Sequence, residues 1–261
     1  MTTPTLISSR DNPFLKELRR LATGSTDYRK QGRFWVEGDH LVRAALVRGA
    51  RPSFGIFSES FWPLAQMEYT NAATKNIVIS DGLYDTISAL ESPARMGFVF
   101  ELPAAPALQN GAATVILDRV QDAGNVGAIL RSASAFGFKQ VIALRGTAAL
   151  WSPKVLRAGM GAHWGLRLIE HADLALLAQL TVPLLVTSSH RGDFLHQSLQ
   201  KQQLPMPCAW AFGHEGQGVC AELETRANQH VRIAQPGGEE SLNVATAAAI
   251  CLHASATANL G

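Results

Sequence analysis

Short apolar runs separated by helical segments fill the second half of this 261-residue chain. Each run is continuous rather than alternating, which is typical of strands that are buried on both faces of a parallel sheet. We therefore expect an α/β domain with a mostly parallel sheet and helices on both sides. The predicted strands are 114–120, 140–145, 166–170, 183–188, 208–213 and 230–234. A last helix, 243–258, is apolar on nearly every side, which predicts burial in the core or in a subunit interface.

The first half alternates in the same way on a smaller scale. Asn12 and Pro13 suit the cap and the first residue of a helix that would end at Gly24. Strands are predicted within 33–38, 52–60, 76–81 and 95–102, and further helices within 39–50, 61–70 and 82–92. A stretch rich in proline and alanine then interrupts the pattern and is typical of a linker. We predict a small α/β domain over 1–104, a linker over 105–113 and a larger domain over 114–261.

Composition excludes several classes of protein. Apolar residues make up 47% of the chain and charged residues 17%, which fits a folded protein rather than a disordered one. No apolar run is long enough for a membrane helix, and the N-terminus lacks the apolar core of a signal peptide. The three scattered cysteines predict neither a disulfide framework nor a metal site. We expect a cytoplasmic protein that uses no metal and no membrane.

Charge is distributed unevenly along the chain. The net charge of +2 does not by itself call for a nucleic-acid partner. Residues 1–51, however, hold ten Lys and Arg against five Asp and Glu. This excess fits an RNA-binding surface and fits a solvated helix face with a basic loop equally well. The candidates for contact with RNA phosphates are Arg19, Arg20, Arg29, Lys30 and Arg33.

Three polar, glycine-containing clusters follow predicted strands, where an open α/β sheet binds its ligands. The first, "DAGNVGAILRSASAFG" (122–137), places Asn125 at the turn and Arg131 one helical turn beyond. The second is "AFGHEGQGV" (211–219), and the third is "VRIAQPGGEESLNVATAAAICLHA" (231–254). The first cluster lacks the G-x-G-x-x-G spacing of a dinucleotide fingerprint, and no acidic residue is placed to hold a ribose. Both points count against an ordinary Rossmann-type nucleotide enzyme.

In this order the clusters resemble the three motifs of the SpoU/TrmH family of RNA ribose 2′-O-methyltransferases. The first family motif is D-P-x-N-x-G followed by a helix with an arginine, and it is matched by Asp122, Asn125, Gly127 and Arg131. The second motif, F-G-x-E-G-x-G, is matched by Phe212, Gly213, Glu215, Gly216 and Gly218. The third ends in S-L-N, matched by Ser241, Leu242 and Asn243. The chain departs from the family at Ala123, where proline is usual, and at Ala234-Gln235, where the family has P-M.

The resemblance implies the SPOUT fold, a parallel sheet whose C-terminal part is tied in a deep trefoil knot. It also implies S-adenosylmethionine (SAM) as the methyl donor and a homodimer. The residues that it places in the catalytic site are Arg131, Asn125, Glu215, Ser241 and Asn243. Those that it places at the cofactor are Gly213, Ile233, Leu242, Gly216 and Thr187. The N-terminal half resembles, more loosely, the ribosomal-protein-like substrate-binding domain of many members.

The chemistry of methyl transfer explains why an arginine is present, whereas two roles remain open for each of two other residues. A ribose hydroxyl is a poor nucleophile, and a guanidinium is permanently charged, so Arg131 suits alkoxide stabilisation better than proton abstraction. The Asn125 side chain either fixes the turn through local backbone hydrogen bonds or contacts the substrate. Ser241 is either a site residue or the cap of the last helix, and His214 is expected to have no catalytic role.

The domain pairing favours ribosomal RNA over transfer RNA as substrate. The alternative outside catalysis is an RNA-binding or assembly factor whose SPOUT domain has degenerated. The intact residues Arg131, Glu215, Ser241 and Asn243 count against it.

Overall fold

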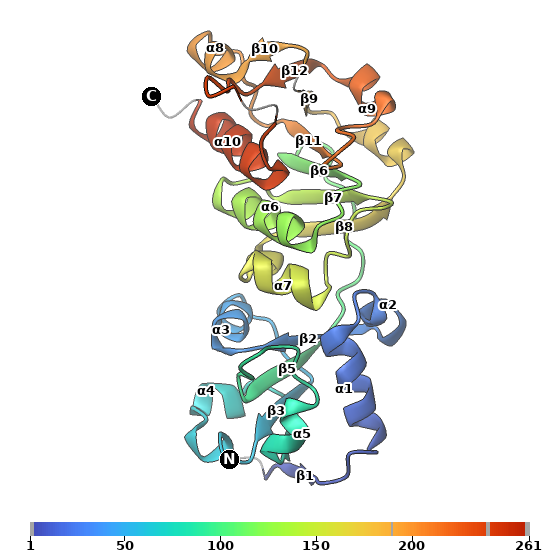
Figure 1. The fold of residues 1–261 in the computed structure, drawn as a ribbon, viewed down its shortest axis with the longest axis vertical. Coiled ribbons are helices and arrows are strands. Elements are labelled where there is room, and N and C mark those ends of the chain that lie inside the picture. Colours follow the sequence, from blue (N-terminus) through green and yellow to red (C-terminus); the bar gives the residue numbers. More distant parts are fainter. Residues whose placement is uncertain (1–2, 189, 239–240, 259–261) are drawn as a thin grey trace. The chain divides into compact units, whose positions relative to one another are not determined.

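The computed structural model describes residues 3–188, 190–238 and 241–258, which form two compact units (Figure 1). The first unit comprises Met1–Ala104 with Trp151–Trp164, and the second comprises Ala105–Leu150 with Gly165–Gly261. The segment Trp151–Trp164 is thus grouped with the first unit, whereas we predicted it in the larger domain. Its aromatic rings explain this, because Trp151 lies 4.7 Å and Trp164 6.4 Å from the Phe34 ring, centroid to centroid.

The first unit is built on a mixed five-stranded sheet. Its strands, in the spatial order β1-β4-β3-β5-β2, are β1 (Thr5–Ile7), β4 (Lys75–Ile79), β3 (Phe54–Ser58), β5 (Met96–Glu101) and β2 (Arg33–Glu37). β5 runs antiparallel to both of its neighbours, while β1, β4 and β3 pair in parallel. The helices of this unit are α1 (Pro13–Thr23), α2 (Asp27–Gln31), α3 (Asp39–Val47), α4 (Met67–Thr70), α5 (Asp81–Asp85) and α7 (Pro153–Gly159).

Local sequence explains where these helices begin and end. The Asn12 side chain accepts a 2.9 Å hydrogen bond from the Phe14 N–H and caps α1, and Gly24 ends that helix, as predicted. The predicted helix 61–70 is instead divided into a 3₁₀ turn, Trp62–Leu64, and the short α4. Pro63 explains the division, since proline has no N–H for a continuous helical hydrogen-bond series. The predicted helix 82–92 is also reduced, to α5.

The second unit contains a seven-stranded sheet in which every described pairing is parallel. In the spatial order β10-β12-β9-β11-β6-β7-β8, the strands are β10 (Asp193–Phe194), β12 (Gln229–Arg232), β9 (Leu184–Thr187), β11 (Ala209–Gly213), β6 (Thr114–Asp118), β7 (Gln140–Leu144) and β8 (Arg167–Ala172). The predicted α/β class with a parallel sheet is confirmed. The two-residue β10 was not predicted, because so short a strand has no periodicity. The trefoil knot stays a prediction from the resemblance.

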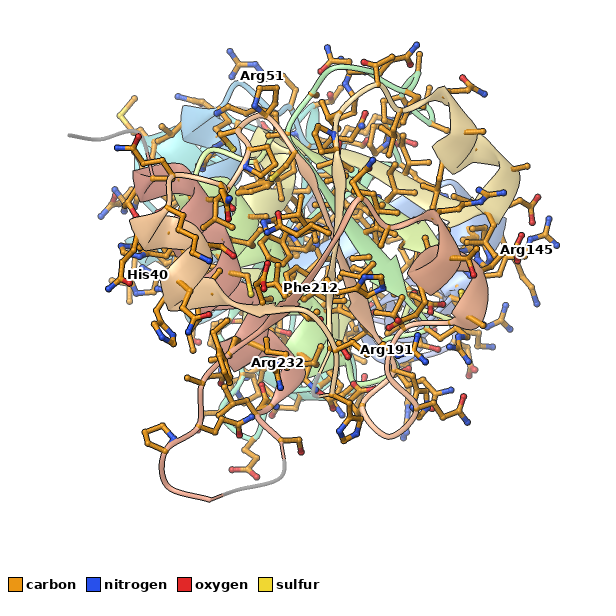
Figure 2. All side chains as sticks on the ribbon, turned by 90° about the horizontal axis from the view of Figure 1, so that it is seen from above. His40, Arg51, Arg145, Arg191, Phe212 and Arg232 are labelled. Atoms are coloured by element: carbon orange, nitrogen blue, oxygen red, sulfur yellow. The ribbon has the colours of Figure 1, made fainter. Side chains whose placement is uncertain are left out.

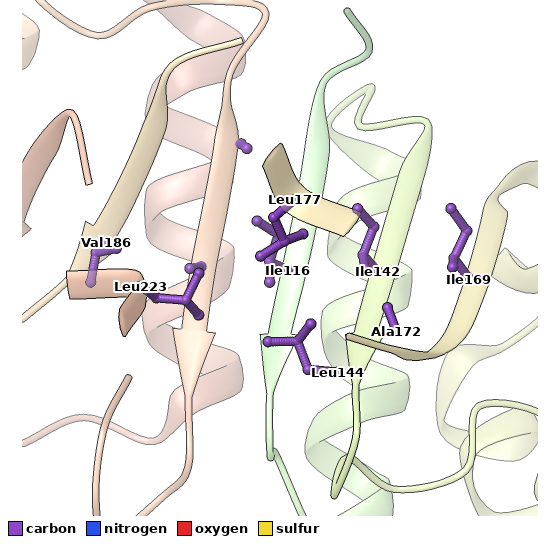
Figure 3. Packing of buried hydrophobic residues seen from close by; sticks show 10 residues of the cluster. Ile116, Ile142, Leu144, Ile169, Ala172, Leu177, Val186 and Leu223 are labelled. Carbon is purple, nitrogen blue, oxygen red and sulfur yellow. The ribbon is translucent and has the colours of Figure 1, made fainter. Parts of the chain in front are cut away.

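Side chains of β11 alternate between the two faces of this sheet. Ala209 and Ala211 join the core on the face covered by a 3₁₀ helix (Leu174–Gln179) and α9 (Ala221–Arg226), to which Leu177 and Leu223 belong (Figure 3). The opposite face is covered by α6 (Ala123–Ala135) and α10 (Val244–Thr257), with α8 (Leu195–Gln200) beside α10 (Figure 1). Trp210 on that face donates a 2.9 Å hydrogen bond from Nε1 to Ser255 Oγ on α10. The predicted last helix is therefore partly buried in the core.

Part of the predicted linker is attached to the second unit. The Gln109 N–H donates a 2.9 Å hydrogen bond to Gln140 Oε1 at the start of β7. The carbonyl of Ala107 accepts one of 3.1 Å from Arg167, and the carbonyl of Asn110 accepts one of 2.9 Å from the Thr181 N–H. Residues 107–110 are therefore held in place by hydrogen bonds rather than free.

Candidate functional site

The carboxyl ends of four neighbouring strands, β12, β9, β11 and β6, bring the predicted site together. Gly213 ends β11 directly opposite Asp118, which ends β6. Thr187 ends β9, and Ile233 follows the last residue of β12. Because parallel strands all end at the same edge, three of the predicted cofactor residues lie along one edge of the sheet.

The first motif forms the start of α6. Asp122 caps this helix, since its Oδ1 accepts a 2.7 Å hydrogen bond from the Asn125 N–H. Asn125 therefore lies in the first helical turn, not in the loop before it as expected. Arg131 lies six residues further, about 9 Å along the helix axis and nearly two turns away, so the expected spacing of one turn is wrong.

Glu215, from the second motif, contacts the first motif through Oε1 and the residue before that motif through Oε2. Its Oε1 accepts hydrogen bonds of 3.1 Å from Asn125 Nδ2 and 3.1 Å from the Asp122 N–H. Its Oε2 accepts one of 3.3 Å from the Gln121 N–H. Burial raises the pKa of Glu215, but hydrogen bonds from its own N–H, from Asn125 and from the Asp122 and Gln121 backbone outweigh burial. The net pKa lies below the ordinary value of 4.5, which keeps this carboxyl ionised at neutral pH.

Asn243 connects the third motif to the other two. Its Nδ2 donates a 2.9 Å hydrogen bond to Asn125 Oδ1. Its Oδ1 accepts bonds of 2.9 Å from the Ala245 N–H and 3.2 Å from the Thr246 N–H, which makes Asn243 the cap of α10. The alternative that Ser241 caps this helix is thus wrong, because the helix begins two residues later. The side chains of Glu215, Asn125 and Asn243 form one continuous hydrogen-bonded chain through all three motifs.

The remaining predicted catalytic residues stay accessible to a ligand. Arg131 is exposed on α6, and Ser241 is exposed just before α10, as is Leu242, which was predicted to bind the cofactor. Within the described part of the chain, no hydrogen bond or ion pair holds the Arg131 guanidinium. An exposed permanent cation on α6 is suited to stabilising negative charge on a bound substrate.

The loop of the second motif, residues 214–218, requires glycine where it begins. A Cβ on Gly213 would lie 2.1 Å from the carbonyl carbon of Gly218, so no other residue fits. His214 closes the loop, since its Nδ1 accepts hydrogen bonds from the Gly216 and Gln217 N–H groups at 3.0 and 3.3 Å. The side chain of His214 is thus used for loop structure. Thr187 is similarly engaged, because its hydroxyl donates a 3.4 Å bond to the Ala211 carbonyl.

Three polar residues at this edge were not singled out from the sequence. Arg119 contacts Asp118 and Gln217, and Asp118 also accepts a 2.7 Å hydrogen bond from the Cys220 N–H. An acidic residue directly at the end of a buried apolar run, followed by arginine, was the signal that could have found the first two. Nothing in the sequence around Gln217 indicates its partner.

The structure separates the five predicted RNA-contacting residues into two groups. Arg19 donates to Thr86 Oγ1 at 3.1 and 3.0 Å, Arg33 forms an ion pair with Glu17, and the Arg29 guanidinium lies 5.2 Å from the centre of the Tyr28 ring. These three side chains support the first unit itself. The exposed pair consists of Arg20 and Lys30.

Two features of the sheet edge bear on SAM, the cofactor that the resemblance implies. Cβ atoms added to the exposed Gly218, Gly237 and Gly238 would meet nothing within 4 Å, so these three positions border open space. Gln235 Oε1 is buried, and among the described residues no donor reaches it. The amino groups of SAM would supply such a donor.

The described residues contain no group of three or more His, Cys, Asp or Glu side chains placed to hold a metal ion. They also contain no helix that is long and apolar enough to cross a membrane.

Comparison with known proteins identifies both halves of the chain. Residues 112–253 match the model of the SpoU rRNA methylase family, and residues 12–96 match an MRM3-like substrate-binding domain. The chain is 28% identical over 250 residues to the 23S rRNA (guanosine(2553)-2′-O)-methyltransferase RlmP of Bacillus subtilis, covering 95% of this chain and 97% of the relative.

Solved structures agree with this match. An RNA 2′-O ribose methyltransferase shares 28% identity with a TM-score of 0.79, covering 98% of this chain and 100% of the other. An AdoMet-bound rRNA methyltransferase from Sinorhizobium meliloti shares the fold, with 24% identity, a TM-score of 0.82, and coverage of 98% and 99%. The family model alone spans more than half of the sequence and coincides with the motif-bearing unit. The chain belongs to the SpoU rRNA methylase family.

Proposed function

We propose that the chain transfers a methyl group from SAM to a ribose 2′-hydroxyl of ribosomal RNA. The observation that carries this proposal is the hydrogen-bonded chain from Glu215 through Asn125 to Asn243. It gathers the three family motifs at the ligand-binding edge of the sheet. Family membership and the named 23S rRNA methyltransferase relative support the same reaction.

Bound SAM would supply an already activated methyl group. The residues of the protein therefore act mainly on the nucleophile, the ribose 2′-hydroxyl. With SAM bound, its methyl carbon would pass from sulfur to the ribose oxygen, and the hydroxyl proton would leave to water or to a substrate phosphate. Arg131 stabilises the negative charge that develops on the oxygen. Asn125 and Glu215 hold the start of α6, and thereby Arg131, in place. Gly213, Gly216, Ile233 and Leu242 hold the cofactor, to which Gln235 adds an acceptor.

The first unit supplies contacts to the RNA backbone in this proposal. Its match to a substrate-binding domain and the exposed charges of Arg20 and Lys30 support that role. Arg19, Arg29 and Arg33 contribute less, since each already has a partner within the unit. RNA contact through these cations predicts an affinity that falls with salt concentration.

We further propose a cytoplasmic homodimer. The support for a dimer is an apolar groove of about 490 Å³ between α8 and α10, lined by Leu195, Leu199, Ile250 and His253 among others. Ile250 is 38% exposed, and such apolar surface favours burial against a second copy. Light scattering that finds a stable monomer would reject the dimer. Free cysteines support the cytoplasm as location.

The decisive experiment is transfer of labelled methyl from SAM to RNA from a strain that lacks this gene. The RNA is fractionated first and the products are digested to nucleosides. Label in 2′-O-methylnucleosides of the ribosomal fraction is the expected result. Label confined to transfer RNA would correct the substrate, and a protein that binds no SAM and transfers no label would overturn the proposal.

A further inference from the structure

Arg119 has an unusual backbone for an arginine. Its φ is 59°, in the left-handed region that glycine adopts freely and other residues adopt at an energetic cost. The residue lies between the end of β6 and the first motif, at the ligand-binding edge. Its N–H donates a 3.1 Å hydrogen bond to Thr147 Oγ1, which holds this conformation in place. A strained non-glycine residue at such a position suggests that its side chain is needed.

All three nitrogen atoms of the Arg119 guanidinium donate hydrogen bonds, and they bind two partners. Nε and Nη2 donate to the two carboxylate oxygens of Asp118 at 2.9 and 3.2 Å, a bidentate arrangement. Nη1 donates to Gln217 Oε1 at 2.9 Å. The Asp118 side chain is only 4% exposed, so the pair is anchored in the end of the sheet. The guanidinium therefore connects the rigid end of β6 to the middle of the 214–218 loop.

That loop needs such a connection because it is rich in glycine. Gly216 and Gly218 give it many conformations in the absence of contacts. Glu215 attaches one side of the loop to the start of α6, and the Arg119–Gln217 bond attaches the other side to β6. Two attachments on opposite sides fix the position of Glu215, whereas one would let the loop pivot.

We propose that Arg119 is a positioning residue for methyl transfer, acting through Gln217 to hold the 214–218 loop over the cofactor edge. It keeps Glu215 bonded to Asn125, and it keeps Gly213 and Gly216 in the shape that receives SAM. The role rests on the proposed function. In this role Arg119 itself touches neither the cofactor nor the ribose.

Gln217→Ala is the sharpest test, because it removes the acceptor and leaves the Asp118–Arg119 pair intact. SAM affinity, measured by calorimetry without RNA, is expected to fall roughly tenfold or more, the size expected for a lost hydrogen bond to a charged group. The thermal midpoint is expected to stay unchanged. Amide hydrogen exchange at Gly216 and Gly218 is expected to accelerate, which a change remote from the loop would not cause. Gln217→Glu keeps the acceptor and is expected to restore most of the affinity.

Arg119→Gly provides the second arm of the test. Glycine relieves the backbone strain while removing the guanidinium, so the variant is better suited than alanine. It is expected to lose SAM affinity as Gln217→Ala does. The double variant is expected to be no weaker than Arg119→Gly alone, because both changes remove the same bond.

Arg145→Ala is the matched control. Arg145 is 71% exposed, ion-paired with Asp173 at 2.7 Å, and lies at the periphery of the molecule (Figure 2). Its removal is expected to leave SAM affinity unchanged. SAM affinity of Gln217→Ala within twofold of wild type, or equal losses in Gln217→Ala and Gln217→Glu, would overturn the positioning role alone. A wild-type protein that binds no SAM would overturn the proposed function, and this role with it.

Discussion

Asn243 donates a 2.9 Å hydrogen bond to Asn125 across a separation of 118 residues. The bond joins the cap of α10 to the first turn of α6. Because the Asn125 amide also donates to Glu215 at 3.1 Å, its orientation is fixed from both ends. The network therefore couples the folding of the last helix to the geometry of the site.

Asn243→Ser separates the two roles of this asparagine. Serine caps a helix well, so the free energy of unfolding is expected to change by less than about 0.5 kcal/mol. The donor to Asn125 is lost, and methyl transfer is expected to fall roughly fivefold or more. Urea denaturation and initial rates measure the two effects. Asn243→Ala, which loses the cap as well, is expected to cost about 1 kcal/mol of stability. Full activity in the serine variant would show that the bond to Asn125 has no catalytic importance.

Arg131→Ala is expected to retain SAM binding and lose methyl transfer. The loss expected for one charge-stabilising group is about a hundred- to a thousandfold in kcat. Single-turnover assays with saturating SAM measure it, and calorimetry verifies cofactor binding. Turnover close to that of the wild type would exclude a catalytic role for this guanidinium.

Glu215 predicts a pH dependence of stability with a definite sign. Its folded-state pKa is lowered from 4.5, so its hydrogen bonds stabilise the protein above that pH. This contribution is lost as the pH falls from 4.5 through the folded-state pKa. The stability difference between wild type and Glu215→Gln is therefore expected to be largest near neutral pH and to shrink in acid. Urea titrations at several pH values measure it, and a difference that grows on acidification would contradict the assignment.

The exposed cations of the first unit predict a salt effect on RNA affinity. Arg20→Ala with Lys30→Ala is expected to reduce the slope of log affinity against log salt by about 0.7–0.9 for each phosphate contact removed. Stability is expected to stay the same, since both side chains are exposed. Filter binding at several salt concentrations provides the slope. An unchanged slope would place the RNA surface elsewhere.

Much of the second unit could be predicted from its sequence. Strands such as Ala209–Gly213 are continuous apolar runs, and burial on both faces leaves a parallel sheet as the natural solution. The resemblance to the SpoU/TrmH motifs also placed Asn125, Glu215 and Asn243 in one site. The hydrogen bonds among those side chains could not be predicted from the sequence, because the order of β9, β11 and β6 decides which loops meet.

The sequence-based predictions that were wrong or incomplete have local physical causes. Ser241 and Asn243 are both good caps, and only the first helical hydrogen bonds decide between them. Pro63 divides a segment whose apolar spacing looks helical. The Arg119–Gln217 bond depends on the register that places Asp118 opposite Gly213. Such a register is a property of the assembled sheet rather than of either segment.

The bond between Asn125 and Asn243 also has a consequence for synthesis of the chain on the ribosome. A nascent chain that contains β6, β7 and α6 already carries Arg131 and Asn125, but no partner for the Asn125 oxygen. The network closes only after residue 243 has emerged and α10 has formed. Any shorter translation product therefore lacks the Asn243 contact, and the hydrogen-bonded chain through the three motifs is completed only near the end of synthesis.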